Sequence, residues 1–147
     1  PHLEACLLDS LKKRVNFLEE TFALLKLENI TAIHGRAEEF AKNKAYREQY
    51  DLCVSRAVSN LATLSEYCLP YVKVGGNFIS YKSGTVQEEL QQAEKAVKIL
   101  GGKIQDVVYF NLPDSEIQRS LVVIEKMKPT PGRYPRKAGT PLKEPLS

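Results

Sequence analysis

The chain has 147 residues, of which 43% are hydrophobic and 27% charged, a composition typical of one soluble globular domain. No apolar stretch reaches the roughly 18–20 residues that cross a membrane, which predicts a cytoplasmic protein. The sequence contains no CxxC or HxxxH spacing, so no metal site is expected. The charge is uneven, because residues 126–147 carry six cations and one acid, whereas residues 1–125 carry 15 cations and 17 acids. A basic tail on a near-neutral domain suggests a polyanion as partner.

The first part of the chain predicts alternating strands and helices. Residues 3–9 predict a strand, and the apolar residues that follow at steps of four and three predict an amphipathic helix capped by Ser10. That apolar stripe consists of Leu11, Val15, Leu18, Phe22 and Leu25. Residues 30–34 predict a second strand, "AEEFAKNK" a short helix, and residues 50–57 a third strand.

The second part predicts the same alternation and then two consecutive strands. A helix begins at Asn60 and stops near Pro70, and residues 77–82 predict a strand. Residues 85–100 predict a helix with a glycine stop. The last two strands, over residues 103–112 and 119–127, are expected to pair antiparallel through a turn, with Tyr109 and Phe110 in the core.

This order of elements predicts an α/β domain with a mostly parallel sheet over residues 1–127. Residues 128–147 hold five of the eight prolines and little apolar mass. They predict an extended or disordered basic tail.

Polar residues follow every predicted strand of the parallel part. In an open parallel sheet, ligands bind beyond the carboxyl ends of the strands. The residues found there are Asp9 and Ser10, then Gly35 to Glu38, then Ser55 and Arg56, and finally Tyr81 to Gly84. A carboxylate such as Asp9 can accept two hydrogen bonds from a ribose diol, or it can help to cap the following helix.

Three cations, Lys12, Lys13 and Arg14, crowd the first turn of the first predicted helix. A cation there opposes the helix dipole at a cost of about 0.3–1 kcal/mol. The cations are explained if an anion such as nucleic-acid phosphate docks nearby, or they form a solvated basic face.

Four motifs together closely resemble the bacterial glucose-inhibited division protein B family: "LLDSLKKRVNFLEE", "LENITAIHGRAEEF", "YDLCVSRAVSNL" and "RYPRKAGTP". Members of that family transfer a methyl group from S-adenosylmethionine to N7 of a guanine in small-subunit (16S) ribosomal RNA. The resemblance covers the whole chain. It implies the class I methyltransferase fold, a Rossmann-like doubly wound sheet of seven strands whose last strand is antiparallel.

The resemblance also implies roles for individual residues. Asp9 and Ser10 are expected beside the cofactor ribose, Ala37 and Glu38 beside the adenine, and Arg56 at the cofactor and target base, where it is the catalytic candidate. The expected RNA-facing cations are Lys12, Arg14, Lys82, Arg133, Arg136 and Lys137. No metal is expected, and the implied partner is ribosomal RNA or the small ribosomal subunit.

In the family, a first strand and a glycine-rich loop precede the position of Pro1. The chain therefore resembles a C-terminal portion, and an incomplete fold is expected, with a gap between its first and third strands. Such a gap is expected to close locally, to be filled by a second copy through the exposed strand edges, or to leave the fold marginally stable. Little activity is expected from residues 1–147 alone.

Two other functions fit parts of the pattern. An acid after a strand also suits a nicotinamide-dependent oxidoreductase, although the closing hairpin and the basic tail argue against it. A non-catalytic RNA-binding fragment fits the basic residues and requires no glycine-rich loop.

Overall fold

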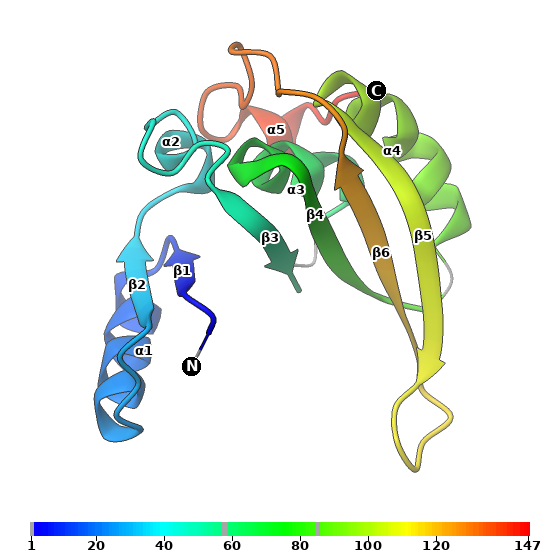
Figure 1. The fold of residues 1–147 in the computed structure, drawn as a ribbon. Coiled ribbons are helices and arrows are strands. Elements are labelled where there is room, and N and C mark those ends of the chain that lie inside the picture. Colours follow the sequence, from blue (N-terminus) through cyan, green and yellow to red (C-terminus); the bar gives the residue numbers. More distant parts are fainter. Residues whose placement is uncertain (1, 57–58, 85) are drawn as a thin grey trace.

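The strands form two separate sheets, as Figure 1 shows for the computed structural model, which describes residues 2–56, 59–84 and 86–147. The smaller sheet pairs two strands in parallel, β1 (Ala5–Asp9) and β2 (Ile30–His34). The larger sheet has the order β3-β4-β6-β5, with β3 parallel to β4 and β6 antiparallel to both of its neighbours. Its strands are β3 (Tyr50–Ser55), β4 (Val72–Ser83), β5 (Gly102–Asn111) and β6 (Gln118–Lys126).

The first four α-helices lie where the sequence predicts them, with different ends, whereas the last one lies in the segment predicted to be extended or disordered. They are α1 (Lys12–Leu24), α2 (Ala37–Phe40), α3 (Leu61–Cys68), α4 (Gln87–Ile99) and α5 (Thr140–Lys143), with one 3₁₀ turn, η1 (Leu69–Tyr71). Asn60 caps α3 as predicted, because its side chain accepts a hydrogen bond from the Thr63 amide at 2.9 Å. Gly101 ends α4 with a φ of +93°, the left-handed conformation that favours glycine.

The gap expected between the first and third strands is present. In the described part of the chain no ladder of backbone hydrogen bonds joins β1 to β3, so the expected local closure is not seen. The Tyr50 side chain, at the start of β3, interacts with the Cys6 thiol of β1. Burial, followed by the neighbouring Cys6, raises the pKa of Tyr50 to about 12.

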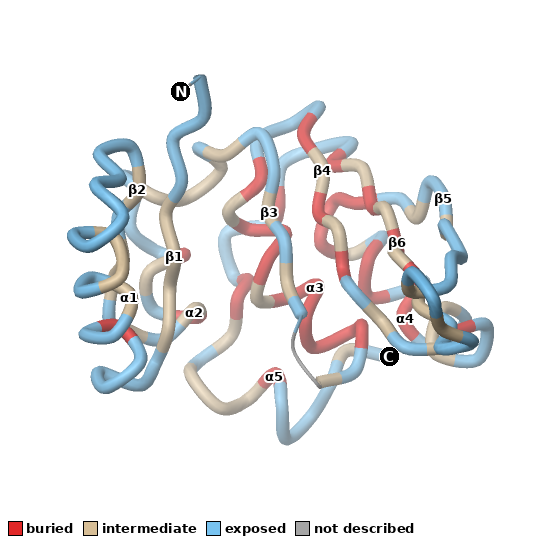
Figure 2. Tube along the Cα trace, turned by 90° about the horizontal axis from the view of Figure 1, so that it is seen from below, coloured by how far each residue is buried: buried red, intermediate tan, exposed pale blue. Residues whose placement is uncertain are grey.

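The core lies between one face of the larger sheet and helices α3 and α4 (Figure 2). Side chains that alternate along β4 and β6 pack there against the two helices. The core includes Phe78, Val122 and Ile124 from the strands, Leu61 and Leu64 from α3, and Val97 from α4. The opposite face is open, because Leu52 and Val54 of β3 are each more than half exposed. One layer of helices therefore covers one side of this sheet.

Helix α1 packs against the small sheet through a narrow contact. Of the predicted apolar stripe, Val15 is buried, whereas Leu11 and Leu25 are 49% and 61% exposed. The helix was predicted correctly and the burial of its stripe was not, because β1 and β2 alone offer too little surface to cover it.

The segment 128–147, predicted to be extended or disordered, packs against the domain and has little regular secondary structure apart from one short helix. It passes from the end of β6 toward α2 and back over α3, where it forms α5 (Figure 1). Thr130, Tyr134 and Pro141 are buried. Proline restricts the unfolded chain, so a segment rich in proline loses less entropy when it docks.

Candidate functional site

The carboxyl ends of the parallel strands bring the predicted site residues into two groups. Asp9 lies beside His34 in the register of β1 and β2, and α2 follows directly after β2. The second group, around Arg56 and Lys82, lies at the corresponding ends of β3 and β4. The two groups stand on either side of the gap between the sheets.

Asp9 organises the entry into α1. One carboxylate oxygen accepts a hydrogen bond from the Leu11 amide at 2.8 Å, and the other lies 3.4 Å from the guanidinium of Arg14. This supports the capping role that the sequence left open, while the ribose contact stays a prediction. The predicted Ser10 cap is wrong, because the N-cap residue is Leu11. The Ser10 carbonyl instead accepts from His34 Nε2 at 3.1 Å.

The start of α2 is held firmly by its surroundings. Glu38 is 4% exposed, and its carboxylate lies 3.6 Å from Arg36 Nε and accepts from the Gly139 amide at 3.0 Å. The carbonyl of Ala37 accepts from the Tyr71 hydroxyl at 2.6 Å. Burial raises the pKa of Tyr71, so this hydroxyl remains a donor at neutral pH.

A cavity of about 620 Å³ lies at the carboxyl ends of β3 and β4. Cationic and aromatic side chains line it, namely Arg56, Lys82, Arg119, Tyr81 and Phe110, together with Ser83, Glu89, Leu112, Ser120 and Leu121. Arg56 is exposed there. Lys82 donates to the Ser59 carbonyl at 2.6 Å, its ammonium group forms an ion pair with Glu89 at 2.8 Å, and 10% of its side chain is exposed. Arg56 is therefore the more available cation.

Sequence reasoning missed two residues of this cavity. Arg119 enters because β6 pairs with β4 so that Arg119 stands opposite Ser83. The predicted hairpin implies that register, so the hairpin was the sequence signal that could have placed Arg119 in this cavity. Phe110 and Tyr109 were predicted to pack in the core, which is wrong, since they are 39% and 42% exposed on the last part of β5.

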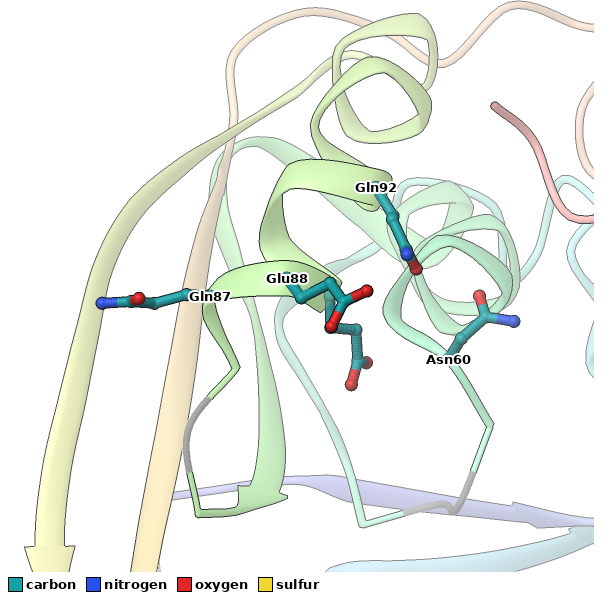
Figure 3. A pocket seen from close by; sticks show the side chains of 5 residues that line it. Asn60, Gln87, Glu88 and Gln92 are labelled. Carbon is teal, nitrogen blue, oxygen red and sulfur yellow. The ribbon is translucent and has the colours of Figure 1, made fainter.

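A second cavity of about 560 Å³ opens between the N-termini of α3 and α4 (Figure 3). Its lining is polar and partly acidic: Asn60, Gln87, Glu88, Glu89 and Gln92. In Figure 3 Gln92 points toward Asn60, whereas Gln87 extends away from it. The acids of the first α4 turn stabilise the helix dipole, and this cavity offers no cation for a phosphate.

The predicted RNA-facing cations differ in how free they are. Lys12 and Lys137 are exposed, and 66% of the Arg14 side chain is exposed despite its contact with Asp9. Exposed Arg133 lies 5.2 Å from the centre of the Tyr134 ring. Arg136 is engaged with the Glu66 carboxylate, to which it donates from Nε at 3.0 Å and from the guanidinium end at 2.8 Å. An RNA contact by these residues stays a prediction, and Arg136 already serves the fold.

The described residues contain no cluster of three or more potential metal-ligating His, Cys, Asp or Glu side chains. Within the same ranges, no helix is long and apolar enough to span a membrane.

The fold is that of the class I S-adenosylmethionine-dependent methyltransferases. The chain superposes on M. jannaschii TYW2 in complex with AdoMet with a TM-score of 0.62 and 12% identity, covering 84% of this chain and 58% of that one. It superposes on an rRNA methylase from Streptococcus thermophilus with a TM-score of 0.59 and 16% identity, covering 85% and 74%. At such identities the likeness concerns the fold alone.

The chain belongs to the GidB family, described as rRNA small subunit methyltransferase G, whose profile matches residues 1–122. It is 56% identical over 146 residues to the ribosomal RNA small subunit methyltransferase G of Lachnoclostridium phytofermentans, and 53% identical to that of Clostridium novyi. In both cases the match covers 99% of this chain and 60% of the relative. The chain thus spans about three fifths of the length of these curated relatives. Membership in this family confirms the resemblance and argues against the oxidoreductase.

Proposed function

We propose that this chain carries the target-binding half of an S-adenosylmethionine-dependent methyltransferase that modifies N7 of a guanine in 16S ribosomal RNA. The observation that carries the proposal is the cavity at the carboxyl ends of β3 and β4, where Arg56, Lys82 and Arg119 meet two exposed aromatic rings. Cations recognise phosphate and base edges, and aromatic rings stack on unpaired bases.

The residues present fit the cofactor. Asp9 keeps a carboxylate oxygen that, among the described residues, the exposed Arg14 approaches at 3.4 Å, so this oxygen remains able to accept from a ribose diol, with Ser10 beside it. The first amides of α2 have no partner within the helix, which leaves the backbone around Ala37 and Glu38 able to bind an adenine edge. Arg56 lies across the gap, where it would contact the target.

The chemistry asks little of the protein beyond orientation. S-adenosylmethionine, when bound, supplies an electrophilic methyl group. Guanine N7 has a lone pair and no proton, so no general base is required, in agreement with a cavity lined by neither His nor Cys. Arg56 or Arg119 donates to guanine O6, while Tyr81 or Phe110 stacks on the ring and holds N7 in line.

Ribosomal RNA or the small subunit is the proposed partner. The exposed cations Lys12, Arg14, Arg133 and Lys137 would contact phosphates, and Lys82 would orient the base through its fixed ammonium group. Arg136 contributes by holding the C-terminal segment. Such binding weakens steeply with salt because counterions are released. We place the activity in the cytoplasm, where the substrate is made.

The decisive test is calorimetric titration of S-adenosylmethionine into this chain and into a version extended upstream through the family's glycine-rich loop. We expect binding by the extended version and weak or absent binding by residues 1–147. Binding by neither would contradict the roles of Asp9, Ser10, Ala37, Glu38 and Arg56.

A second function for the 147-residue chain is RNA binding without catalysis. The gap between β1 and β3 favours it, because the two proposed halves of the cofactor site stand on its opposite sides. Methyl transfer to 16S RNA by residues 1–147 at the rate of the extended version would exclude it.

The open strand edges lead us to propose that the isolated chain associates with itself. Leu52 and Val54 are 52% and 56% exposed on β3, at the edge that borders the gap. Sedimentation should show an average mass that rises with concentration, and the double variant Leu52→Lys/Val54→Lys should reduce this rise. A well-folded monomer at all concentrations would contradict self-association.

A further inference from the structure

The C-terminal segment is fixed near its start by Arg47. One guanidinium group donates to the carbonyls of Thr130 at 3.0 Å, Pro131 at 3.2 Å and Tyr134 at 2.8 Å, and it also donates to the carbonyl of Ala41 at 3.2 Å. Ala41 is the fully buried C-cap residue of α2. The same side chain therefore holds the C-terminal segment and the end of α2.

The middle of the segment is fixed to α3 by a buried carboxylate. Glu66 is 0% exposed and accepts from the Arg136 backbone amide at 2.8 Å as well as from its guanidinium. Hydrogen bonds to Glu66 raise the pKa of Arg136. Since a carboxylate seldom stays charged in a core without a partner, Glu66 requires this segment to be docked.

The last part of the segment reaches the start of α2. The Gly139 amide donates to Glu38 at 3.0 Å, and Thr63 donates to the Pro141 carbonyl at 3.0 Å. Gly139 has a φ of +87°, which favours glycine at this point. Helix α2 has one turn and cannot be stable alone, so its position depends on these contacts.

We propose that residues 130–141 act as a strap that positions the first turn of α2 for the cofactor. The inference rests on the proposed adenine contact of Ala37 and Glu38. Within the strap, Arg136 is a positioning residue, because it acts through Glu66 and through the segment that carries Gly139.

The first test is hydrogen exchange at the Phe40 and Ala41 amides, which bond within α2. We expect Arg136→Ala to accelerate this exchange by about tenfold or more, Arg136→Lys to accelerate it less, and Lys103→Ala, at an exposed position on β5, to leave it unchanged. The Leu90 amide in α4 serves as internal reference. If Arg136→Ala does not fold, a chain that ends at residue 138 keeps Arg136 and loses the Gly139 contact. Unchanged exchange in α2 in the folded variants overturns the proposal.

The second test measures affinity for S-adenosylhomocysteine in the extended version. Arg136→Ala should weaken binding at least about fivefold relative to Lys103→Ala, the low end of coupling between linked sites. Equal affinity of both variants, with wild-type binding intact, would overturn the positioning role. Absence of wild-type binding would contradict the proposed function instead, and the exchange experiment would then decide whether the strap holds α2.

Discussion

Arg119 lies in the cavity at the carboxyl ends of β3 and β4, although the sequence did not indicate it as a site residue. It stands beside Arg56 and Lys82 because of the strand register, and its neighbour Ser120 is buried. Among the three cations, Lys82 is already paired with Glu89.

We expect Arg119→Gln to weaken binding of single-stranded RNA without changing the slope of log affinity against log salt concentration, because the proposed contact of Arg119 is to a base edge. A fall of that slope by about 0.7 would assign Arg119 to a phosphate contact instead. Fluorescence anisotropy at several salt concentrations measures both, with exposed Lys98→Gln as the control. Unchanged affinity and slope would remove Arg119 from the RNA site.

Lys126 is a fully buried cation at the end of β6. Its ammonium group donates to the carbonyls of Leu69 at 2.7 Å and Val72 at 2.9 Å and lies 3.1 Å from Glu48. Burial lowers the pKa of Lys126, and the hydrogen bond to Glu48 opposes that shift.

Lys126→Met should lower the free energy of unfolding by about 1–3 kcal/mol, because two buried carbonyls lose their donor. Denaturant unfolding measures this change. Lys128→Met, at an exposed position, should stay within about 0.5 kcal/mol of wild type. Equal stability of the two variants would show that water replaces the ammonium group.

Tyr50 makes the free energy of unfolding depend on pH in the alkaline range. Because its pKa rises from 10.0 unfolded to about 12 folded, folding favours the phenol. The resulting stabilisation is complete below pH 10 and is lost as the pH rises through about 12. Tyr50→Phe should therefore lose less stability than wild type over this range in denaturant titrations. Tyr109→Phe, at an exposed position, is the control. If the free energy of unfolding fell equally with pH for Tyr50→Phe and wild type, Tyr50 would not be the source of the alkaline dependence.

At the scale of elements, β1, α1 and β2 form the least covered part of the chain. Phe17 and Leu24 of α1 are 66% and 82% exposed, and Val15 is its buried contact. Helix α4, in contrast, buries Ala93, Ala96 and Val97.

Hydrogen exchange should therefore be faster in α1 than in α4 by at least about tenfold, since local opening requires less apolar area to be exposed there. The Val15 and Leu90 amides provide the comparison, because each donates to the carbonyl of its helix's N-cap residue, Leu11 and Val86 respectively. Equal protection of the two amides from exchange would mean that the rest of the molecule stabilises β1, α1 and β2.

The elements that the sequence predicted best are those set by local signals. The apolar period located α1 and α4, the Asn60 cap located α3, and the turn after β5 located the hairpin. Ser10 failed as a cap because the helix begins one residue later, with Leu11 as its N-cap residue, and the Asp9 carboxylate accepts from the Leu11 amide. Contacts between distant residues, such as Glu66 with Arg136, have no local signal, so the docking of the C-terminal segment was not predictable.

The same distinction holds for the site. The strand ends gave Asp9, Arg56 and Lys82, because parallel strands bring their carboxyl ends to one edge. Whether a cation is free or already paired depends on neighbours that only the fold supplies, as Glu89 does for Lys82.

At the scale of the whole molecule, the order of strands explains both what is stable and what is open. The larger sheet has its own core between β4, β6, α3 and α4, whereas the smaller sheet joins it across a gap. The proposed cofactor residues lie at the smaller sheet and the target cavity lies at the larger sheet. They meet only if that gap is spanned. The stability of the fold and the proposed function therefore both depend on how the gap between β1 and β3 is filled.

The contact between Gly139 and Glu38 joins residues that are 101 positions apart. During synthesis Glu38 leaves the ribosome long before Gly139 is made, so the start of α2 stays without this support until the C-terminal segment has been synthesised. A nascent chain that stops short of Gly139 would have the earlier part of the proposed site in a loose form. Synthesis of that segment would thus act as the step that readies the proposed cofactor site.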